Sequence, residues 1–223
     1  MRTKIRLNRL ASIISILLFD SVGVVSESLI SFVPSIVLNR CRRKIFVQPL
    51  GVNFDVFQKE DVELAQKKLG IKKGKYILFS DKSNTPLKRK DIAERIITHL
   101  DGFNLLVMCG VSPELVPNYL NSSEAVLITS DIEGSPNIVR EALALNKRVF
   151  SFDVGDVCKQ IEGLKNSCII SRNVLEAAYV IKEKLETEYT DNTRISLRNK
   201  LDMNKLTSGV IDIYVKLLSP MSK

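Results

Sequence analysis

Two carboxylates eight positions apart, Glu133 and Glu141, bracket the segment of this chain that is best suited to chemistry. The residues between them read Gly-Ser-Pro-Asn-Ile-Val-Arg. Ser135 is a good helix N-cap and Pro136 suits a first helical position, so we expect a loop that turns into a helix here. Glu133 then lies in the loop, and Glu141 projects from the second turn of the helix.

The helix start expected between the two acids can bind an anion. It presents unpaired N–H groups and the positive end of the helix dipole, both of which favour a phosphate. Carboxylates accept hydrogen bonds from hydroxyls. A sugar nucleotide fits both features, because its phosphates can bind at the helix start and its sugar and ribose hydroxyls can bind the acids. The segment therefore predicts a sugar nucleotide as ligand. Taken singly, Glu141 could instead complement the helix dipole, and Glu133 could be a solvated loop acid.

The elements that must position this segment alternate between short apolar strands and helices. We expect strands at 76–80, 104–109, 125–129, 148–152 and 167–170, and helices at 91–100, 112–120, 136–145, 156–161 and 175–186. This alternation predicts the α/β class, with a Rossmann-like doubly wound parallel sheet. Ligands of such sheets bind beyond the carboxyl ends of the strands, and the loop of Glu133 opens on that edge.

The rest of the chain is less regular. On its amino-terminal side we expect a strand at 22–26, a helix at 27–37, a strand at 44–49 and a helix at 59–69 that ends at Gly70. Helices at about 193–204 and 206–218 complete the pattern.

Composition limits the partners. The 223 residues are 45% apolar and contain no Trp, so the core must be mostly aliphatic, as in buried parallel strands. The net charge of +8 favours polyanionic partners: nucleotides, anionic lipid surfaces or nucleic acid. Nucleic acid is excluded, because the basic residues are dispersed and are not interleaved with aromatic ones.

Cysteine usage argues against a metal centre. Four widely spaced cysteines and a single histidine predict neither zinc nor a disulfide framework. Cys109 and Cys168 lie in apolar runs and are expected to be small core residues. A reducing, cytoplasmic location follows.

The amino terminus combines charge with an apolar run. Arg2, Lys4, Arg6 and Arg9 precede ten mainly apolar residues, 10–19, which are too few to span a bilayer. Three readings remain open, in this order: an amphipathic helix that packs in a larger protein, a helix at a membrane surface, and a signal peptide.

The order of several motifs resembles a known family. The segment 133–144 resembles the E-x7-E signature of retaining GT-B glycosyltransferases of family 4. Residues 25–28 are similar to the motif that closes the acceptor domain in this family, residues 51–57 to the motif that opens the donor domain, and residues 148–156 continue the match. The resemblance covers roughly residues 20 to 218.

The resemblance implies an architecture. The chain would be the C-terminal, donor-binding lobe of a GT-B fold with a residual N-terminal helical segment, the acceptor domain being largely missing. The implied division is 1–40 for the end of the acceptor domain, 41–205 for the nucleotide-sugar donor-binding domain, and 206–223 for a C-terminal crossover helix and tail.

The resemblance also implies roles for the acidic segment. Transfer would retain the anomeric configuration and need neither metal nor cofactor. Glu133 would be catalytic, facing hydroxyls of the transferred sugar, and Glu141 would bind the ribose. The donor's sugar-phosphate end would meet four residues of the loop and helix start, Gly134, Ser135, Pro136 and Asn137.

Basic residues after the strand 76–80 would neutralise the diphosphate leaving group in this family. Lys88 fits the lysine position and is expected to be catalytic. The arginine position is occupied by Asn84, so Lys82 or Arg89 would have to substitute; alternatively these cations form a solvated loop. Gly110, in the loop after strand 104–109, opens on the same edge and is expected to contact the donor.

Three functions remain open. The first is a glycosyltransferase acting on a UDP- or GDP-sugar, of which this chain is the donor-binding half. The second is a non-catalytic nucleotide-sugar binding module or an inactive remnant, and the third is an epimerase of the same bilobal fold. Expected partners are the nucleotide-diphosphate sugar, a separate acceptor-domain polypeptide or a homo-oligomer, and peripheral contact with an anionic membrane at its cytoplasmic face.

Overall fold

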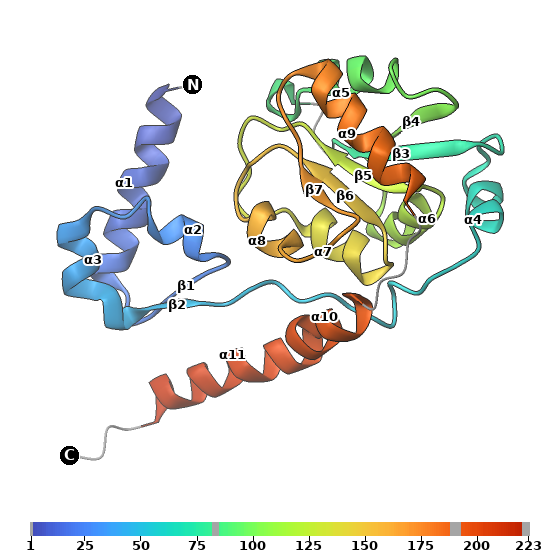
Figure 1. Ribbon diagram of the computed structural model, residues 1–223. Helices are drawn as coiled ribbons and strands as arrows, with labels where there is room; N and C mark the ends of the chain where they lie inside the picture. The colour runs from blue at the N-terminus through green and yellow to red at the C-terminus, as the bar shows by residue number, and fades with distance from the viewer. Residues whose placement is uncertain (1, 82–84, 188–192, 220–223) are drawn as a thin grey trace. The chain divides into compact units, whose positions relative to one another are not determined.

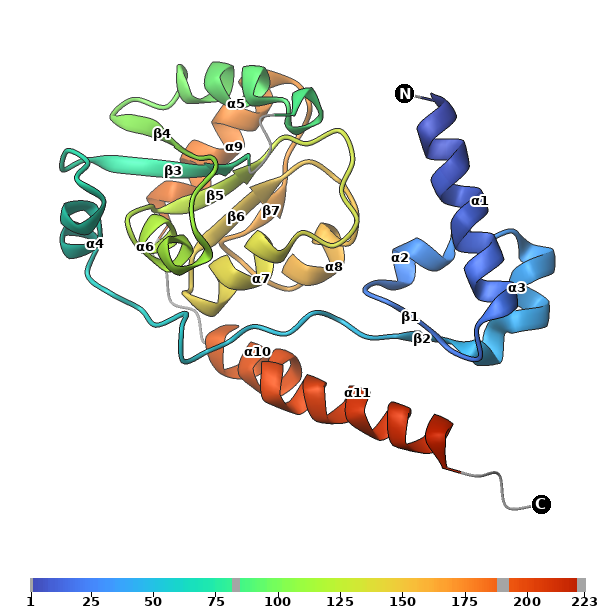
Figure 2. The same ribbon diagram turned by 180° about the vertical axis from the view of Figure 1, so that it is seen from behind.

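The computed structural model describes residues 2–81, 85–187 and 193–219; for residues 2–9 and 193–196 it describes the backbone only. Contacts divide the chain into two compact units. Unit 1 consists of Met1–Gly51 and Met203–Lys223, and unit 2 consists of Val52–Asp202. Figures 1 and 2 show the elements of both units from opposite sides.

Unit 2 is built on a five-stranded sheet in which every pairing is parallel, as the alternating pattern predicts. The strand order is β4-β3-β5-β6-β7. Its strands are β3 (Lys75–Ser80), β4 (Phe103–Met108), β5 (Ala125–Ile128), β6 (Arg148–Ser151) and β7 (Cys168–Ile169).

The order of the strands places a topological switch between β3 and β5. The chain leaves β3 for β4 on one side, then returns to form β5 on the other side, and continues outward through β6 and β7. Phe79 of β3 is accordingly in register with Val107 of β4 and Leu127 of β5. The crevice beyond the carboxyl ends of β3 and β5 is where such sheets bind ligands.

Helices cover both faces of this sheet, as a parallel sheet requires. In Figures 1 and 2, α5 and α9 lie on one face, and α6, α7 and α8 lie on the other. The helices of unit 2 are α4 (Val62–Leu69), α5 (Lys90–Ile97), α6 (Val116–Asn121), α7 (Asn137–Ala144), α8 (Val157–Ile161), α9 (Val174–Glu186) and α10 (Thr193–Leu201), with 3-10 turns η2 (Pro86–Lys88) and η3 (Pro113–Leu115).

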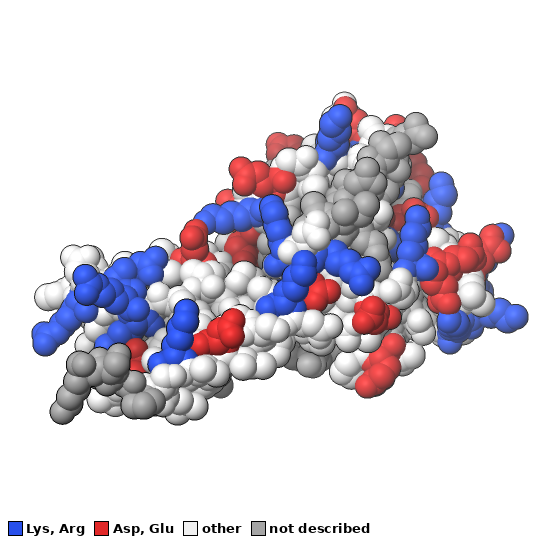
Figure 3. Space-filling model, turned by 90° about the horizontal axis from the view of Figure 1, so that it is seen from below, with Lys and Arg blue, Asp and Glu red and all other residues white. Residues whose placement is uncertain are grey.

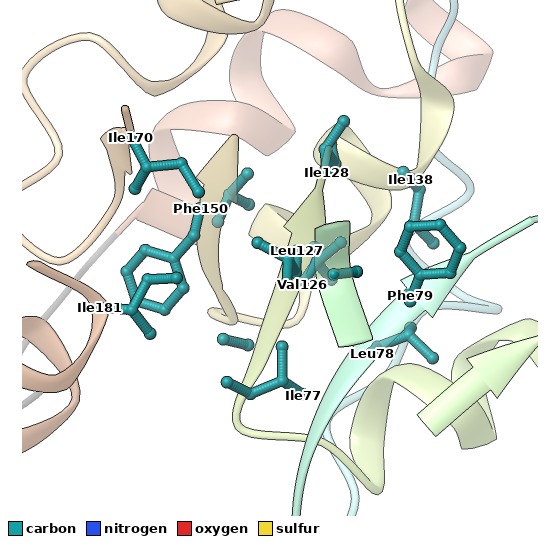
Figure 4. Close-up of a cluster of buried hydrophobic side chains, with 14 of the residues drawn as sticks. Ile77, Leu78, Phe79, Val126, Leu127, Ile128, Ile138, Phe150, Ile170 and Ile181 are labelled. Carbon is teal, nitrogen blue, oxygen red and sulfur yellow. The ribbon is translucent and has the colours of Figure 1, made fainter. Parts of the chain in front are cut away.

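The core of unit 2 is mostly aliphatic, as the lack of Trp predicts. Ile77, Leu78 and Phe79 of β3 are at most 1% exposed, and they lie beside Val126 and Leu127 of β5 in Figure 4. The side chains of β6 join the same cluster, where they meet those of α9. Burial on both faces fixes the central strands, so the loops at their ends start from rigid positions.

Local signals set the ends of α4. The Asp61 carboxylate accepts a hydrogen bond from the Leu64 amide at 3.0 Å and caps the first turn. Gly70 follows the last turn with φ +65°, the left-handed conformation that favours glycine. The helix end expected at Gly70 is confirmed.

Unit 1 contains a two-stranded parallel sheet and several helices. Val22, Gly23 and Val24 of β1 are in register with the three residues of β2. One small core, formed by Ile16, Cys41 and Ile45, lies against this sheet. The elements are α1 (Arg2–Leu18), β1 (Val22–Val24), α2 (Glu27–Ile30), α3 (Ser35–Cys41), η1 (Arg42–Lys44), β2 (Ile45–Val47) and α11 (Met203–Leu218).

The single helix expected at 27–37 is wrong. The structure has two short helices there, α2 and α3, separated by residues 31–34. Pro34 lacks an amide hydrogen, and its ring disfavours the helical conformation of Val33, the residue before it. Helix formation therefore restarts only at Ser35, directly after the proline.

Candidate functional site

The loops after β3 and β5 meet at the switch point. Nζ of Lys88, in the turn η2 that follows β3, donates a 2.6 Å hydrogen bond to Oε1 of Glu133 in the loop after β5. The side chains of Lys88 and Glu133 are 29% and 14% exposed, so water reaches the ion pair only in part. The structure brings together the two residues that the resemblance gives as catalytic.

Hydroxyls of the β5 loop hold this pair in place. Ser130 Oγ donates to the same Glu133 oxygen at 2.7 Å. Thr129, fully buried, places its Oγ1 at 3.0 Å from the Lys88 carbonyl oxygen and 2.9 Å from that of Arg89. The backbone that carries Lys88 is therefore fastened to the end of β5, next to Glu133.

Arg89 is held by two carboxylates. It lies at φ +54°, and its guanidinium donates to both carboxylate oxygens of Asp91 at 3.0 and 2.9 Å, with Asp131 at 3.7 Å. The hydrogen bonds between them raise the pKa of Arg89 and lower the pKa of Asp91. Two further residues of this loop, Lys82 and Asn84, lie outside the described residues.

A second arginine reaches this edge from the end of β7. Arg172 donates to Asp131 at 2.8 Å, and its guanidinium lies 4.8 Å from the centre of the Phe152 ring. Sequence reasoning missed Arg172. The sequence did contain a signal for Arg172: it follows the strand expected at 167–170, and residues that follow the strands of a parallel sheet lie at its ligand-binding edge.

The helix that follows Glu133 begins one residue later than expected. Pro136 is the N-cap of α7 and Asn137 its first residue, so the assignment of Ser135 as N-cap is wrong. Ser135 Oγ instead donates to Asp156 at 2.7 Å and accepts from Arg140 at 2.7 Å. Hydrogen bonds to charged groups are stronger than a neutral capping bond, so they decide where the hydroxyl points.

Arg140 is the centre of a buried network at this helix start. It is 3% exposed and donates to Asn137 Oδ1 at 2.7 Å and to the Ser135 carbonyl at 3.3 Å. Burial lowers the pKa of Arg140, while the charges of Asp156 and Glu141 act in the opposite direction. Sequence reasoning gave Arg140 no role, although a charged residue inside an apolar helix segment was a visible signal.

The loop after β6 packs on the loop of Glu133. Gly155 has φ +59°, and a β-carbon at that position would lie 2.4 Å from the carbonyl oxygen of Gly134. The next residue, Asp156, is the N-cap residue of α8, and its Oδ1 accepts from Gln160 at 2.6 Å. The backbone around Gly134 is thus fixed from two sides.

Glu141 lies one helical turn after Asn137, on the same face of α7. Its side chain is half-buried, and burial raises the pKa of Glu141 whereas the neighbouring Arg140 charge lowers it. Asn137 is exposed at the start of the helix. Both predicted donor-binding residues therefore belong to the helix that starts beside Glu133.

The end of β4 contributes Gly110, which follows the strand at φ +64° in open space. The core position expected for Cys109 is wrong: its side chain is exposed, because Met108 ends the strand and the chain leaves the core there. Cys168 is half-buried in β7, and burial raises the pKa of its thiol.

Within the described part of the chain, no group of three or more His, Cys, Asp or Glu side chains is placed to hold a metal ion. The cationic groups described at this edge are Lys88, Arg89 and Arg172.

No family model and no curated protein matches the chain. Solved structures do. Sucrose-phosphate synthase from Thermosynechococcus elongatus matches with a TM-score of 0.76 and 14% identity, over 96% of this chain and 62% of that one. Anabaena HepE in complex with UDP and glucose matches with a TM-score of 0.71 and 13% identity, over 93% of this chain and 66% of that one. TarM of S. aureus matches with a TM-score of 0.67 and 18% identity, over 91% of this chain and 45% of that one.

These three proteins are GT-B glycosyltransferases. The chain has a GT-B lobe fold. At identities below 20% the likeness establishes the fold alone. The chain spans 62% of the length of the synthase and 66% of that of HepE, so the GT-B lobe described here corresponds to part of those proteins. HepE has also been solved with UDP-glucose and with UDP.

Proposed function

We propose that this chain binds the nucleotide-diphosphate sugar of a glycosyltransferase at the switch point of the unit 2 sheet. The observation that carries the proposal is the contact of Lys88 with Glu133 beside the start of α7. It joins a cation, a hydroxyl-accepting acid and a helix amino end at the edge where parallel sheets bind ligands.

The diphosphate binds between Lys88 and the first amides of α7. When it does, Lys88 moves its hydrogen bond from Glu133 to the phosphate, and the carboxylate becomes free to accept hydroxyls of the sugar. The charge that develops on the leaving diphosphate meets a cation already in place, so transfer needs no metal. The cation and the acid are neutralised by each other until the donor arrives.

Glu141 and Asn137 bind the nucleoside end. The half-buried carboxylate of Glu141 offers two acceptor oxygens, which suit the adjacent hydroxyls of a ribose. The backbone of the loop from Gly134 to Pro136 faces the sugar-phosphate. Hydrogen bonds of Ser135 with Arg140 and Asp156 fix the position of this loop. Gly110 borders the same edge from β4.

The reaction proposed is sugar transfer with retention, as the resemblance to family 4 implies. Groups that bind the acceptor come from a second lobe, on a separate polypeptide or a further segment. This rests on the extra length of the solved GT-B proteins. UDP complexes of HepE support a uridine donor. A non-catalytic nucleotide-sugar module would bind in the same way and is distinguished by turnover.

Titration calorimetry with UDP and GDP tests the donor site. We expect one nucleotide to bind, Glu141→Ala to weaken its binding about tenfold through lost ribose hydrogen bonds, and Lys88→Ala to weaken it about tenfold through the lost charge. Adenosine diphosphate serves as a base control.

Matched controls come from α5. Lys90 and Glu94 form an exposed pair there, one of each charge. Lys90→Ala and Glu94→Ala should leave the affinity unchanged. Equal losses in the α5 variants would show a general charge effect, and absence of binding by both UDP and GDP would remove the proposal.

A further inference from the structure

The net charge of the chain is confined to unit 1. By sequence, unit 1 holds 11 Lys and Arg against 3 Asp and Glu, a net charge of +8, whereas unit 2 holds 22 of each and is neutral. Figure 3 shows the consequence: Lys and Arg side chains gather at one end of the view, and at the other they alternate with Asp and Glu. The basic character of the protein is therefore local, and it does not belong to the donor site.

Exposed apolar side chains concentrate in the same unit. Of the 21 large hydrophobic side chains that are exposed in the described residues, 14 belong to unit 1, which is the smaller of the two. Five of these side chains lie on α1 and just after it, where Leu18 is 75% exposed and Phe19 is 60% exposed. A soluble monomer rarely exposes such a contiguous group without a partner.

These α1 residues form one stripe. Leu10, Ile14, Leu17 and Leu18 recur at helical spacing and are 54%, 45%, 47% and 75% exposed. The other side of the helix packs inward through Ile16, which is 4% exposed. We call Leu10, Ile14, Leu17, Leu18 and Phe19 the α1 stripe.

Basic residues outnumber acids around the stripe, where Asp20 follows Phe19. The sequence of α1 contains four basic residues and no acidic one. The helix α3, which packs against α1, and the turn η1 that follows it contain Arg40, Arg42 and Arg43, all exposed. A helix whose sequence combines an apolar stripe with several Lys and Arg residues and no acidic one is typical of helices that lie in the surface of an anionic bilayer.

We infer that the α1 stripe and its basic neighbours dock unit 1 on an anionic lipid membrane. Nucleic acid would satisfy the charge but not the apolar stripe. A protein partner would cover the stripe but would need a matching acidic surface. A bilayer containing anionic lipid satisfies both at once. No described helix is long and apolar enough to cross a membrane.

Vesicle co-sedimentation of the full chain tests this docking. We expect binding to vesicles of phosphatidylcholine mixed with phosphatidylglycerol, much weaker binding to phosphatidylcholine alone, and release at high salt. Leu18→Glu should weaken binding about tenfold, because it removes apolar contact and adds a negative charge. Arg43→Glu should weaken it at least about fivefold.

Unit 2 supplies the matched controls. Leu175→Glu changes a leucine that is 63% exposed on α9, and Lys182→Glu reverses an exposed charge on the same helix. Both should bind vesicles like the parent. The proposal is overturned if the parent does not sediment with anionic vesicles, if neutral vesicles bind equally well, or if the unit 2 variants lose as much affinity as the unit 1 variants.

The docking does not rest on the donor site. UDP calorimetry and far-UV circular dichroism of Leu18→Glu should both match the parent; the first shows that unit 2 is folded, and the second that the helices of unit 1 are retained. Vesicle binding without nucleotide binding would support the membrane docking and contradict the proposed function. Nucleotide binding without vesicle binding would support the proposed function and contradict the docking.

Discussion

At the scale of single residues, the start of α7 depends on a buried cation. Arg140 donates hydrogen bonds to the Ser135 hydroxyl, the Ser135 carbonyl and the Asn137 side chain. The Ser135 hydroxyl in turn donates to Asp156. Arg140 is 3% exposed and Ser135 and Asp156 are half-buried, so removing one partner leaves groups that water reaches only in part. The network fixes the backbone between Glu133 and the first turn of the helix.

We predict that Arg140→Met lowers the free energy of unfolding by about 2 kcal/mol, since the half-buried hydroxyl and carbonyl of Ser135 lose their partner. Arg140→Lys should recover only part of this, because an ammonium cannot reproduce the planar fork. Urea denaturation measures both variants. Because Ser135 belongs to the same network, Ser135→Ala combined with Arg140→Met should cost less than the two separate losses added. Strict additivity would contradict a shared network.

The same residues show which contacts a sequence can reveal. The contact between Lys88 and Glu133 could be anticipated. The loops that follow parallel strands lie at one edge of the sheet, and the resemblance to family 4 assigns a role to both residues. The bond between Ser135 and Asp156 could not, because capping propensity considers one helix alone and the carboxylate arrives from the next β-α unit. Cys109 was misplaced for a related reason, since an apolar run does not show where its strand stops.

At the scale of elements, the loops after β5 and β6 are interlocked at a glycine. Gly155 adopts φ +59°, and its missing β-carbon leaves room for the carbonyl oxygen of Gly134. Any side chain there must strain its own backbone and also push away the loop that carries Glu133.

We predict that Gly155→Ala destabilises the protein by about 3 kcal/mol, of which about 1 kcal/mol comes from the left-handed backbone and the rest from the collision. It should also weaken nucleotide binding. Gly163→Ala separates the two effects, because Gly163 has φ +78° with no atom near the added carbon. Thermal denaturation of both variants gives the comparison. Equal losses would mean that the contact with Gly134 has no energetic weight.

Element types in unit 2 followed from the sequence, whereas several element ends, such as the start of α7, did not. Continuous aliphatic runs such as 125–128 suit only strands buried on both faces, and every expected strand of this sheet is present. Unit 1 was harder to predict. Its strands have three residues each, and the helix pattern at 27–37 persists across Pro34, whose effect on the backbone overrides hydrophobic periodicity.

At the scale of the whole molecule, the two units differ in net charge and in exposed apolar surface. Unit 2 is electrically neutral, has a closed aliphatic core and carries the candidate donor site. Unit 1 has a core of few residues, the entire net charge and most of the exposed apolar surface. Composition alone gave the total charge of +8 but not its segregation, because the boundaries of the units are set by long-range contacts.

This division leads to a prediction about activity. The proposed donor site consists only of groups that unit 2 holds together, such as Lys88, Glu133 and Glu141. Transfer also needs an acceptor hydroxyl held in productive geometry, and positioning of that kind accounts for a large share of the barrier lowering in two-substrate reactions. The chain spans 62% of the length of sucrose-phosphate synthase, and the proposed function gives acceptor positioning to a further lobe. We therefore expect the purified chain to bind UDP but to release little sugar from UDP-glucose, as followed by chromatographic detection of free UDP. Rapid transfer to an added sugar acceptor by this chain alone would show that the acceptor site is formed within these 223 residues.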